Sequence, residues 1–153
     1  MTKSNFDNVR VLGSRHCFNT IADTKTTGRT AHVSLDKMVW YKFNGLEVTF
    51  GAGSTYSKLM EAVVKQGLAI TNLPSLPHLN VVGSMITGTH GSGHKFGIQA
   101  HMITGFEMVL ADGSLLTLKN TDKDFKKYIL TFGAIGVVTS MTIKLEPKFE
   151  VLK

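Results

Sequence analysis

The chain has 153 residues, of which 42% are hydrophobic and 18% are charged. A chain of this length and composition folds as one globular domain with a buried core, which excludes a disordered protein. Its formal net charge is +6, and because the lysines are scattered, they indicate a solvated cationic surface, whose field would also benefit an anionic ligand. Nucleic-acid binding needs a basic stripe with interleaved aromatic residues, which the sequence does not show.

In chain order, the first predicted elements are strands interrupted by glycine. Residues 9–12 form a short buried strand that runs into a turn at Gly13, and a polar loop over 19–29 leads to a second strand at 31–35. Residues 46–50 alternate in polarity and predict a third strand, which the sequence Gly-Ala-Gly at 51–53 ends.

The clearest helix follows this strand. Ser54 is suited to cap it, and Gly67 ends it. Between them, apolar side chains recur at helical spacing and predict a face that packs into the core: Leu59, Met60, Val63 and Val64. Residues 68–71 return as a short extended piece.

The second half of the chain predicts a hairpin. Residues 102–110 are largely apolar, the turn sequence Ala-Asp-Gly follows at 111–113, and residues 114–118 pair back as the second arm. A short helix then begins at Thr121 or Asp122 and extends to residue 130.

A last strand is predicted at residues 137–145, where the polarity alternates. Gly136 interrupts the chain before it, and Pro147 ends it. Strands and two helices thus intermix without a repeat or a linker, which indicates a single α+β domain.

The segment of residues 75–93 is the most informative, and it reads S-L-P-H-L-N-V-V-G-S-M-I-T-G-T-H-G-S-G. Such a stretch is expected to pack badly as a helix. It suits main-chain N–H groups for contact with phosphate oxygens, because glycine permits close approach and positive φ. The run Gly13-Ser14-Arg15-His16 has the same character. Two such segments predict one long diphosphate ligand held at several points.

Other nucleotide and metal motifs are missing from the sequence. No Gly-Lys-Ser/Thr closes either glycine segment, and Tyr56 stands where a dinucleotide motif that begins at Gly51 needs its third glycine. The histidines and the single cysteine, Cys17, do not have the spacing of metal ligands, so no metal site is expected.

The two glycine segments, the turn at 111–114 and the sequence Gly-Ala-Ile-Gly-Val-Val-Thr-Ser at 133–140 together resemble the FAD-binding (PCMH-type) domain of the vanillyl-alcohol-oxidase family. The resemblance covers nearly the whole chain and is strongest to the alditol and xylitol oxidases, with gulonolactone and arabinonolactone oxidases as near relatives. It implies a small βα subdomain beside a mixed or antiparallel sheet flanked by helices. It also implies FAD as cofactor and an oxidase that acts on the CH–OH groups of polyols or sugar lactones with oxygen as acceptor.

The resemblance assigns roles to residues as well. The histidine matched by His16 carries the flavin covalently in the family, which suits imidazole because its neutral form is a nucleophile near neutral pH. The turn is implied to touch the diphosphate with the backbone of Leu12, Gly13, Ser14, Arg15, His16 and Cys17. The glycine segment is implied to line the flavin from the other side with Ser75, Asn80, Gly83, Ser84, Met85, Thr87, Gly88 and His90. The strand that includes Val138 is implied to meet the adenosine half.

The chain departs from the family pattern at several points. Arg15 stands where glycine is common and Cys17 where serine is commoner. The FAD-binding domain, residues 1–153, lacks the strand and helix with which the family's domain normally begins, and the substrate domain that supplies the catalytic base. We therefore expect no catalytic residue in the chain, a polyol or lactone substrate only where a substrate domain is supplied, and pairing into a homodimer through an exposed sheet edge.

From the residues alone, other interpretations stay open. A histidine beside a Gly-Ser turn is often a local hydrogen-bond partner, Ser75 can be a plain loop serine, and Arg15 can be surface charge. His78 is expected to orient the turn at Pro77. For the whole chain, the alternative is a flavin-binding remnant or accessory chain without turnover. With no apolar run long enough to span a membrane and no apolar signal-peptide core, the sequence predicts a cytoplasmic protein.

Overall fold

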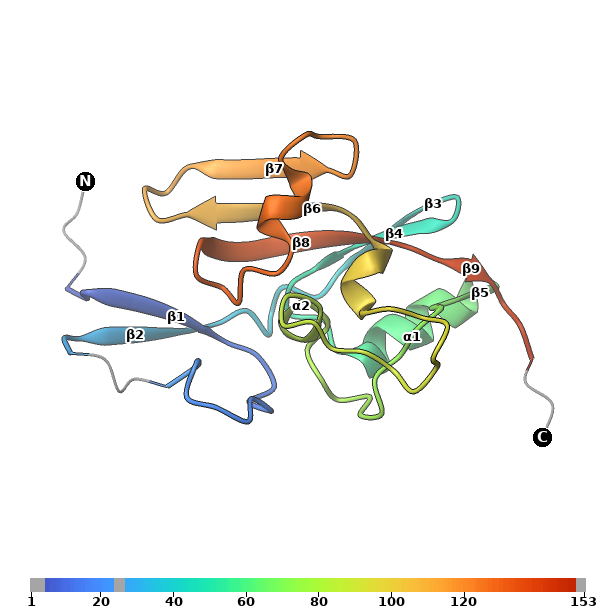
Figure 1. Cartoon of the computed structure of the whole chain (residues 1–153), viewed down its shortest axis with the longest axis horizontal. Helices are drawn as coiled ribbons and strands as arrows, with labels where there is room; N and C mark the ends of the chain where they lie inside the picture. Colours follow the sequence, from blue (N-terminus) through green and yellow to red (C-terminus); the bar gives the residue numbers. More distant parts are fainter. Residues whose placement is uncertain (1–4, 24–26, 151–153) are drawn as a thin grey trace.

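The computed structural model describes residues 5–23 and 27–150. Its centre is a five-stranded antiparallel sheet in the order β3-β4-β8-β6-β7 (Figure 1). These strands are β3 (Tyr41–Asn44), β4 (Glu47–Gly51), β6 (Ile103–Leu110), β7 (Leu115–Lys119) and β8 (Gly136–Lys144). A second, two-stranded sheet pairs β1 (Asn8–Leu12) in parallel with β2 (Thr30–Ser34), and a third pairs β5 (Leu68–Ala69) with β9 (Glu146–Pro147).

The helices are α1 (Tyr56–Lys65), α2 (Val81–Met85) and two 3₁₀ helices, η1 (Gln99–Met102) and η2 (Phe125–Tyr128). Their apolar side chains join one core with the buried face of the sheet, which presents Val48, Phe50, Met141 and Ile143. The opposite face is polar: the hydroxyls of Thr49 and Thr142 bond at 2.9 Å. One wet face and one packed face are usual for an antiparallel sheet.

The α+β class is confirmed, and so are most predicted strands. The strands expected at residues 9–12, 31–35, 46–50, 102–110, 114–118 and 137–145 all form, each within one residue of the expected bounds. Gly136 begins the last strand rather than interrupting the chain before it. A Cβ there would lie 2.5 Å from the Val109 carbonyl oxygen, so the close approach of β6 requires glycine.

The predicted helix over residues 121 or 122 to 130 is shorter than expected, because only η2 (Phe125–Tyr128) is helical, in 3₁₀ form. The strand β3 was not predicted. Its signal is present in the sequence, since Tyr-Lys-Phe alternates and Gly45, with φ of 55°, makes the tight turn into β4. Pro147 lies in β9 rather than beyond the last strand.

Ser54 does not cap α1, which corrects the prediction. The helix begins after Thr55, whose side chain makes no capping hydrogen bond either. The first amides of α1 instead donate to carbonyls of the next loop: Tyr56 N–H to Leu79 at 3.0 Å and Ser57 N–H to Pro77 at 2.7 Å. Because the first turn of a helix needs acceptors from outside it, this loop takes the place of a cap.

The glycine segment contains a helix, which corrects the expectation that it packs badly as one. α2 buries Val81, Val82 and Met85, and the Asn80 side chain accepts the Gly83 amide at its start. Apolar burial and a good N-cap therefore outweigh the weak helix propensity of one glycine.

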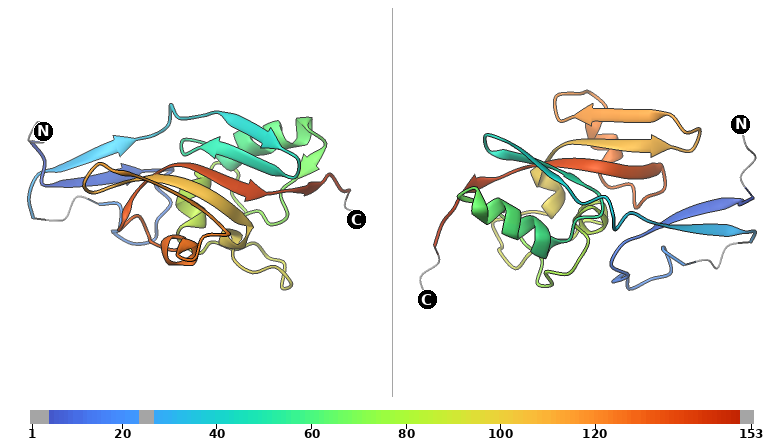
Figure 2. Two further views of the ribbon diagram at one scale, coloured as in Figure 1. Left: turned by 90° about the horizontal axis from the view of Figure 1, so that it is seen from above. Right: turned by 180° about the vertical axis from the view of Figure 1, so that it is seen from behind.

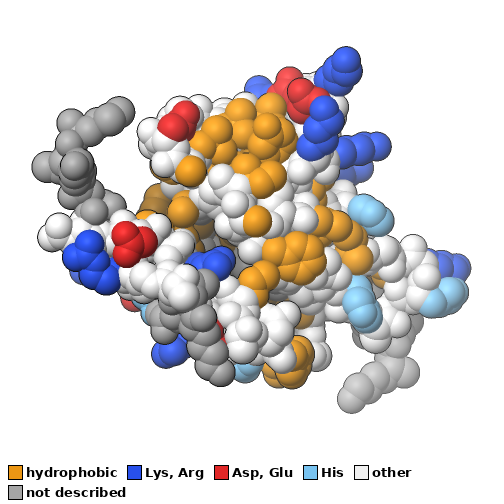
Figure 3. Space-filling model, turned by 60° about the vertical axis from the view of Figure 1, so that its left-hand side comes forward, with side chains coloured by type: hydrophobic (Ala, Val, Ile, Leu, Met, Phe, Trp, Pro, Cys, Tyr) orange, Lys and Arg blue, Asp and Glu red, His pale blue; other side chains and the backbone are white. Residues whose placement is uncertain are grey.

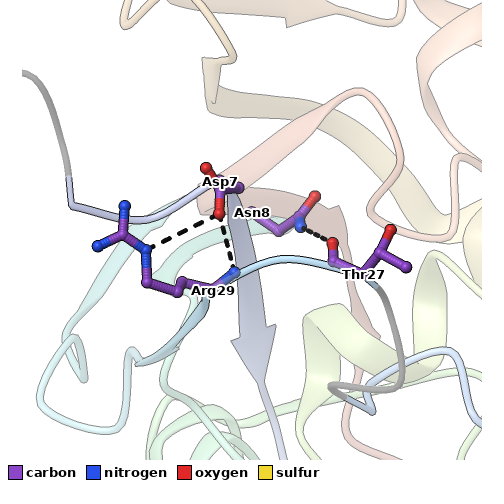
Figure 4. A network of polar contacts seen from close by, with 4 residues as sticks. All are labelled: Asp7, Asn8, Thr27 and Arg29. Carbon is purple, nitrogen blue, oxygen red and sulfur yellow. Dashed lines mark hydrogen bonds and ion pairs between the residues drawn. The ribbon is translucent and has the colours of Figure 1, made fainter.

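The β1–β2 pair projects from the rest of the molecule, as the views in Figures 1 and 2 agree. At its outer end the strands are joined by a polar network (Figure 4). The Arg29 amide donates to the Asp7 carboxylate at 2.9 Å, and Asn8 Nδ2 donates to the Thr27 carbonyl at 3.4 Å. The predicted loop over 19–29 connects the two strands, and its residues 24–26 lie outside the described residues.

The junction between this pair and the sheet is tight. The chain leaving β2 crosses directly over the glycines that follow β4, so that a Cβ on Gly53 would overlap the Leu35 carbonyl oxygen. The Gly53 amide donates to the Met38 carbonyl at 3.0 Å. Among the described residues, no helix is long and apolar enough to cross a membrane.

Candidate functional site

The two glycine segments, far apart in the sequence, lie against each other. A Cβ on Gly13 would be 3.2 Å from the Asn80 Cβ, and Ser14 Oγ donates to the His78 carbonyl at 2.9 Å. The turn after β1 therefore packs directly on the residues that lead into α2. This contact places Gly13, Ser14 and His16 beside the start of α2, where Asn80 and Gly83 lie.

Two histidines, one from each glycine segment, also contact each other. His16 Nε2 and His78 Nε2 lie 2.7 Å apart, within hydrogen-bond distance, and the ring centroids are 4.5 Å apart. Both side chains are exposed. A hydrogen bond between two imidazole nitrogens requires that one carries the hydrogen and the other a lone pair, so each ring holds the other in one tautomer.

Arg15 has the left-handed backbone conformation, with φ of 60°. A side chain with a Cβ is strained there, and glycine is the residue that adopts this conformation without cost. The departure noted in the sequence, arginine in place of glycine, therefore falls at a position whose backbone conformation favours glycine. Strain of this kind tends to occur where a backbone is shaped for function.

Asn80 organises the start of the second segment. Its Oδ1 accepts the Gly83 amide at 2.8 Å and its Nδ2 donates to the Ala52 carbonyl at 2.7 Å, so it joins α2 to the end of β4. A Cβ on Gly83 would meet only the Asn80 side chain, at 3.5 Å, which is an ordinary contact. The fold itself therefore does not demand glycine at position 83.

The rest of the second segment is held by its own polar groups. Thr87 Oγ1 donates to the Gly83 and Ser84 carbonyls, both at 3.0 Å. Gly88 has φ of 75°, and His90 Nδ1 lies 2.9 Å from the Gly91 carbonyl. His90 also lines an open hollow of about 460 Å³ with residues 91–94 and 96–98. Ser75 is exposed in the loop before α2.

Two of the predicted site residues lie inside the core instead. Met85 is fully buried, and Ser84 Oγ bonds to Tyr56 Oη at 2.9 Å and donates to Gln99 Oε1 at 3.2 Å. Tyr56 Oη donates to the same Gln99 oxygen at 2.6 Å. Burial raises the pKa of Tyr56 far above its ordinary value, so it stays a neutral donor. Ser84 and Met85 thus hold α2 in place from within.

The loop between η2 and β8 also contacts the end of α2. The Phe132 amide donates to the Ile86 carbonyl at 3.4 Å, and Leu130, Phe132 and Ile135 of this loop are exposed. Figure 3 shows hydrophobic side chains gathered into patches on the face of the molecule that it draws.

The first residues of β8 complete this region. The pairing of β4 with β8 ends at Gly51 and Ser140, whereas β6 pairs with β8 as far as Gly136. The stretch of β8 at residues 136–138 therefore has a strand on one side only. Val138 itself is buried, so its backbone, rather than its side chain, is what a ligand beside this edge would meet.

The site residues predicted from the sequence thus fall into four groups. The turn from Leu12 to Cys17 packs on Asn80, which also holds Gly83. Ser84 and Met85 lie in the core, Ser75 lies before α2 with Thr87, Gly88 and His90 after it, and Val138 lies in β8. His78 was predicted only to orient the turn at Pro77. Its bond to His16 joins residues 62 apart in the sequence, a contact for which the sequence carries no signal.

Comparisons with known proteins identify the family of the chain. A family described as "FAD binding domain" matches residues 2–119. Alditol oxidase of a Streptomyces species is 39% identical over 137 residues, which cover 89% of this chain and 33% of that protein. L-Gulonolactone oxidase of Mus musculus is 28% identical over 148 residues, which cover 95% of this chain and 33% of that protein. The chain spans about a third of the length of these relatives.

Solved structures share the fold. Cholesterol oxidase from Brevibacterium sterolicum superposes with a TM-score of 0.81 at 20% identity, over 92% of this chain and 30% of that one. 6-Hydroxy-D-nicotine oxidase from Arthrobacter nicotinovorans gives 0.77 at 22% identity, over 91% and 31%. The resemblance predicted from the glycine segments is confirmed, and the chain belongs to the family of FAD-binding domains.

Proposed function

We propose that FAD binds where the two glycine segments meet. The observation that carries this proposal is the packing of Gly13 and Ser14 against His78 and Asn80, because one diphosphate can contact both segments only if they lie side by side. In this arrangement the backbone from Leu12 to Cys17 holds the diphosphate, and the exposed Arg15 supplies a positive charge beside it.

The described residues fit FAD at three places. At the diphosphate, Gly83 leaves its backbone open to close approach, since only the Asn80 side chain borders the space of its missing side chain, at 3.5 Å. The unpaired side of β8 at residues 136–138 offers backbone groups to the adenosine half. The flavin itself then lies along Ser75, Asn80, Thr87, Gly88 and His90, with His16 as its covalent anchor.

The chemistry that FAD would supply in the proposed reaction is acceptance of a hydride from the carbon of a CH–OH group and transfer of the electrons to oxygen. The substrate class, polyols or sugar lactones, rests on the names of the relatives, which include alditol oxidase and D-arabinono-1,4-lactone oxidase. The part of the chain described here holds and orients the coenzyme. The base that takes the hydroxyl proton is proposed to come from outside residues 1–153.

FAD binding is tested by titrating the purified chain with FAD and following the quenching of flavin fluorescence. Gly83→Ala is the matched variant, because alanine suits the helix and meets only an ordinary contact. We expect its stability to equal or slightly exceed that of the wild type, while its affinity for FAD falls at least about tenfold, which corresponds to about 1.4 kcal/mol. Equal FAD affinity in the two proteins would contradict the placement of the diphosphate at Gly83.

A coenzyme-binding chain without turnover is the second candidate, since the chain spans about a third of the length of relatives such as alditol oxidase, 33% of it. Oxygen uptake with xylitol, sorbitol and a sugar lactone separates the two. Uptake by the FAD-loaded chain supports an oxidase by itself, whereas a yellow protein with no uptake on any of them supports the second candidate.

A further inference from the structure

The contact between His16 and His78 has the geometry of a hydrogen bond between two imidazole nitrogens rather than of ring stacking. The two Nε2 atoms lie 2.7 Å apart, and the rings are tilted by 50° rather than stacked. A second contact holds the two segments together independently of the rings, because Ser14 Oγ donates to the His78 carbonyl at 2.9 Å. The Ser14 contact and the contact between the rings therefore hold His16 and His78 against each other.

The direction of this hydrogen bond decides what His16 can do. If His78 donates, the lone pair of His16 Nε2 is occupied and its Nδ1 carries the hydrogen, so that neither nitrogen is free to form a new bond. If His16 donates, its Nε2 carries the hydrogen and its Nδ1 keeps a free lone pair. Only the second arrangement leaves His16 a nucleophile.

We propose that His78 is a positioning residue for the attachment of the flavin to His16. It accepts the hydrogen from His16 Nε2, holds His16 in the nucleophilic tautomer, and takes the proton when Nδ1 forms its bond. This inference rests on the proposed covalent attachment and deepens it, because it names the group that prepares the anchor.

The step balances as follows. A bond forms between His16 Nδ1 and the carbon of the flavin 8-methyl group, while one C–H bond of that methyl group and the N–H bond of the imidazole break. His78 accepts the imidazole proton. The methyl proton would pass to solvent, and the two electrons released would be taken up by the flavin ring. Dioxygen would then take these electrons together with two protons to give hydrogen peroxide.

The experiment mixes the purified apo-chain with FAD in air and measures, over time, the flavin that remains with the protein after acid precipitation. His78→Gly removes the partner and leaves space for imidazole in solution. His78→Gln keeps an acceptor for the His16 hydrogen but cannot take the proton. His32→Ala is the control, since His32 also bonds within the chain, to the Ala22 carbonyl at 3.2 Å, away from the pair.

We expect covalent incorporation to slow on the order of 10²-fold in His78→Gly, as for the loss of a general base, and to recover when imidazole is added. His78→Gln should be slow as well, and imidazole should not accelerate it because the side chain still fills the space. His32→Ala should match the wild type. The affinity for non-covalent FAD, measured in the same proteins by fluorescence, should stay within about threefold, because His78 is proposed to act through His16.

Incorporation at the wild-type rate in His78→Gly overturns the inference. So does a slow His78→Gly protein that imidazole does not accelerate although it binds FAD normally, because that result assigns His78 a purely structural role. A wild-type chain that binds FAD but forms no acid-stable bond overturns the inference and leaves the FAD site standing. A chain that binds no FAD refutes the proposed function itself.

One measurement does not depend on the variants folding or on FAD. Imidazole ¹⁵N NMR of the wild-type apo-chain reports which nitrogen of each ring carries hydrogen. We expect the hydrogen on Nε2 of His16 and on Nδ1 of His78. The reverse assignment, with hydrogen on Nδ1 of His16, overturns the inference.

Discussion

Two regions of the molecule differ in how they are held together. The arm comprises the described residues 5–23 and 27–35, with β1 and β2, and none of these residues is buried. The body, residues 36–150, contains every buried side chain of the described chain, from Val48 to Leu145. The arm joins the body through a few polar contacts and close backbone approaches, chiefly at His78 and Asn80.

The residues that stabilise the fold and the glycine turn proposed to bind the coenzyme therefore lie in different regions. Burial of apolar surface is the main stabilising term, so the body folds largely on its own residues. The glycine turn with His16 sits at the end of β1, in the arm, where little apolar burial fixes it. A coenzyme that contacts both regions would therefore stabilise the arm more than the body.

The largest expected difference between the two regions appears when a side chain is truncated in each. Phe50 is fully buried in the body, whereas Val33 in β2 is 36% exposed. We expect Phe50→Ala to lower the free energy of unfolding by about 3–5 kcal/mol and Val33→Ala to lower it by less than about 1 kcal/mol. Urea denaturation followed by circular dichroism measures both. A Val33→Ala effect as large as that of Phe50→Ala would show that the arm has a core of its own.

A smaller effect tests the buried polar network that fixes α2. Tyr56→Phe removes the hydroxyl that joins Ser84 and Gln99, leaving buried polar atoms with fewer partners, and should cost about 1–3 kcal/mol. Tyr41→Phe is the control, because the Tyr41 hydroxyl is buried without a hydrogen-bond partner, so its removal should cost nothing or be stabilising. Equal losses in the two variants would mean that the hydrogen-bonded hydroxyl of Tyr56 contributes no more to stability than the hydroxyl of Tyr41.

The sequence predicted the body better than the site, and the reason is local signal. Alternation marks β4 and β8, and the stripe from Leu59 to Val64 marks α1, because each pattern lies within a few residues. The start of α1 was mispredicted because its amides are satisfied by a loop twenty or more residues later in the sequence, at Pro77 and Leu79.

The site divides in the same way. Its glycine segments are visible in the sequence as composition, and their order allowed the family to be identified. Which side chains of the second segment face outward was not visible: Ser84 and Met85 point into the core because α2 is a helix packed on α1 and η1. The His16–His78 bond depends on the packing of two distant loops, which no pattern within either loop records.

Relief of backbone strain in the arm should give a still smaller change, of opposite sign. Arg15→Gly removes a left-handed Cβ that costs about 1–2 kcal/mol, but glycine also gives the unfolded chain more freedom, worth about 0.5–1 kcal/mol. We expect a net gain of at most about 1 kcal/mol in the apo-chain, seen as slower hydrogen exchange of the amides of β1 and β2. Arg15→Ala removes the same charge but keeps the Cβ, so it should give no gain. A gain in Arg15→Ala equal to that in Arg15→Gly would assign the effect to charge rather than to strain.

The smallest effect is expected at an exposed turn of the body, which like the arm is held by polar contacts without burial. Asp112 accepts the Ser114 amide at 2.9 Å and the Ser114 hydroxyl at 2.6 Å, and these bonds, the hydroxyl first, lower the pKa of Asp112 below its ordinary value of 3.8. Because the pKa is lower in the folded state, the contribution to stability is complete above pH 3.8 and is lost as the pH falls through the folded value. An NMR titration of the Asp112 carboxyl should give a midpoint below 3.8, and Ser114→Ala should return it toward that value with little change in stability at neutral pH. A Ser114→Ala protein that unfolds as readily as Tyr56→Phe would show that exposed polar contacts stabilise this fold as much as buried ones, and the distinction drawn between arm and body would then not hold.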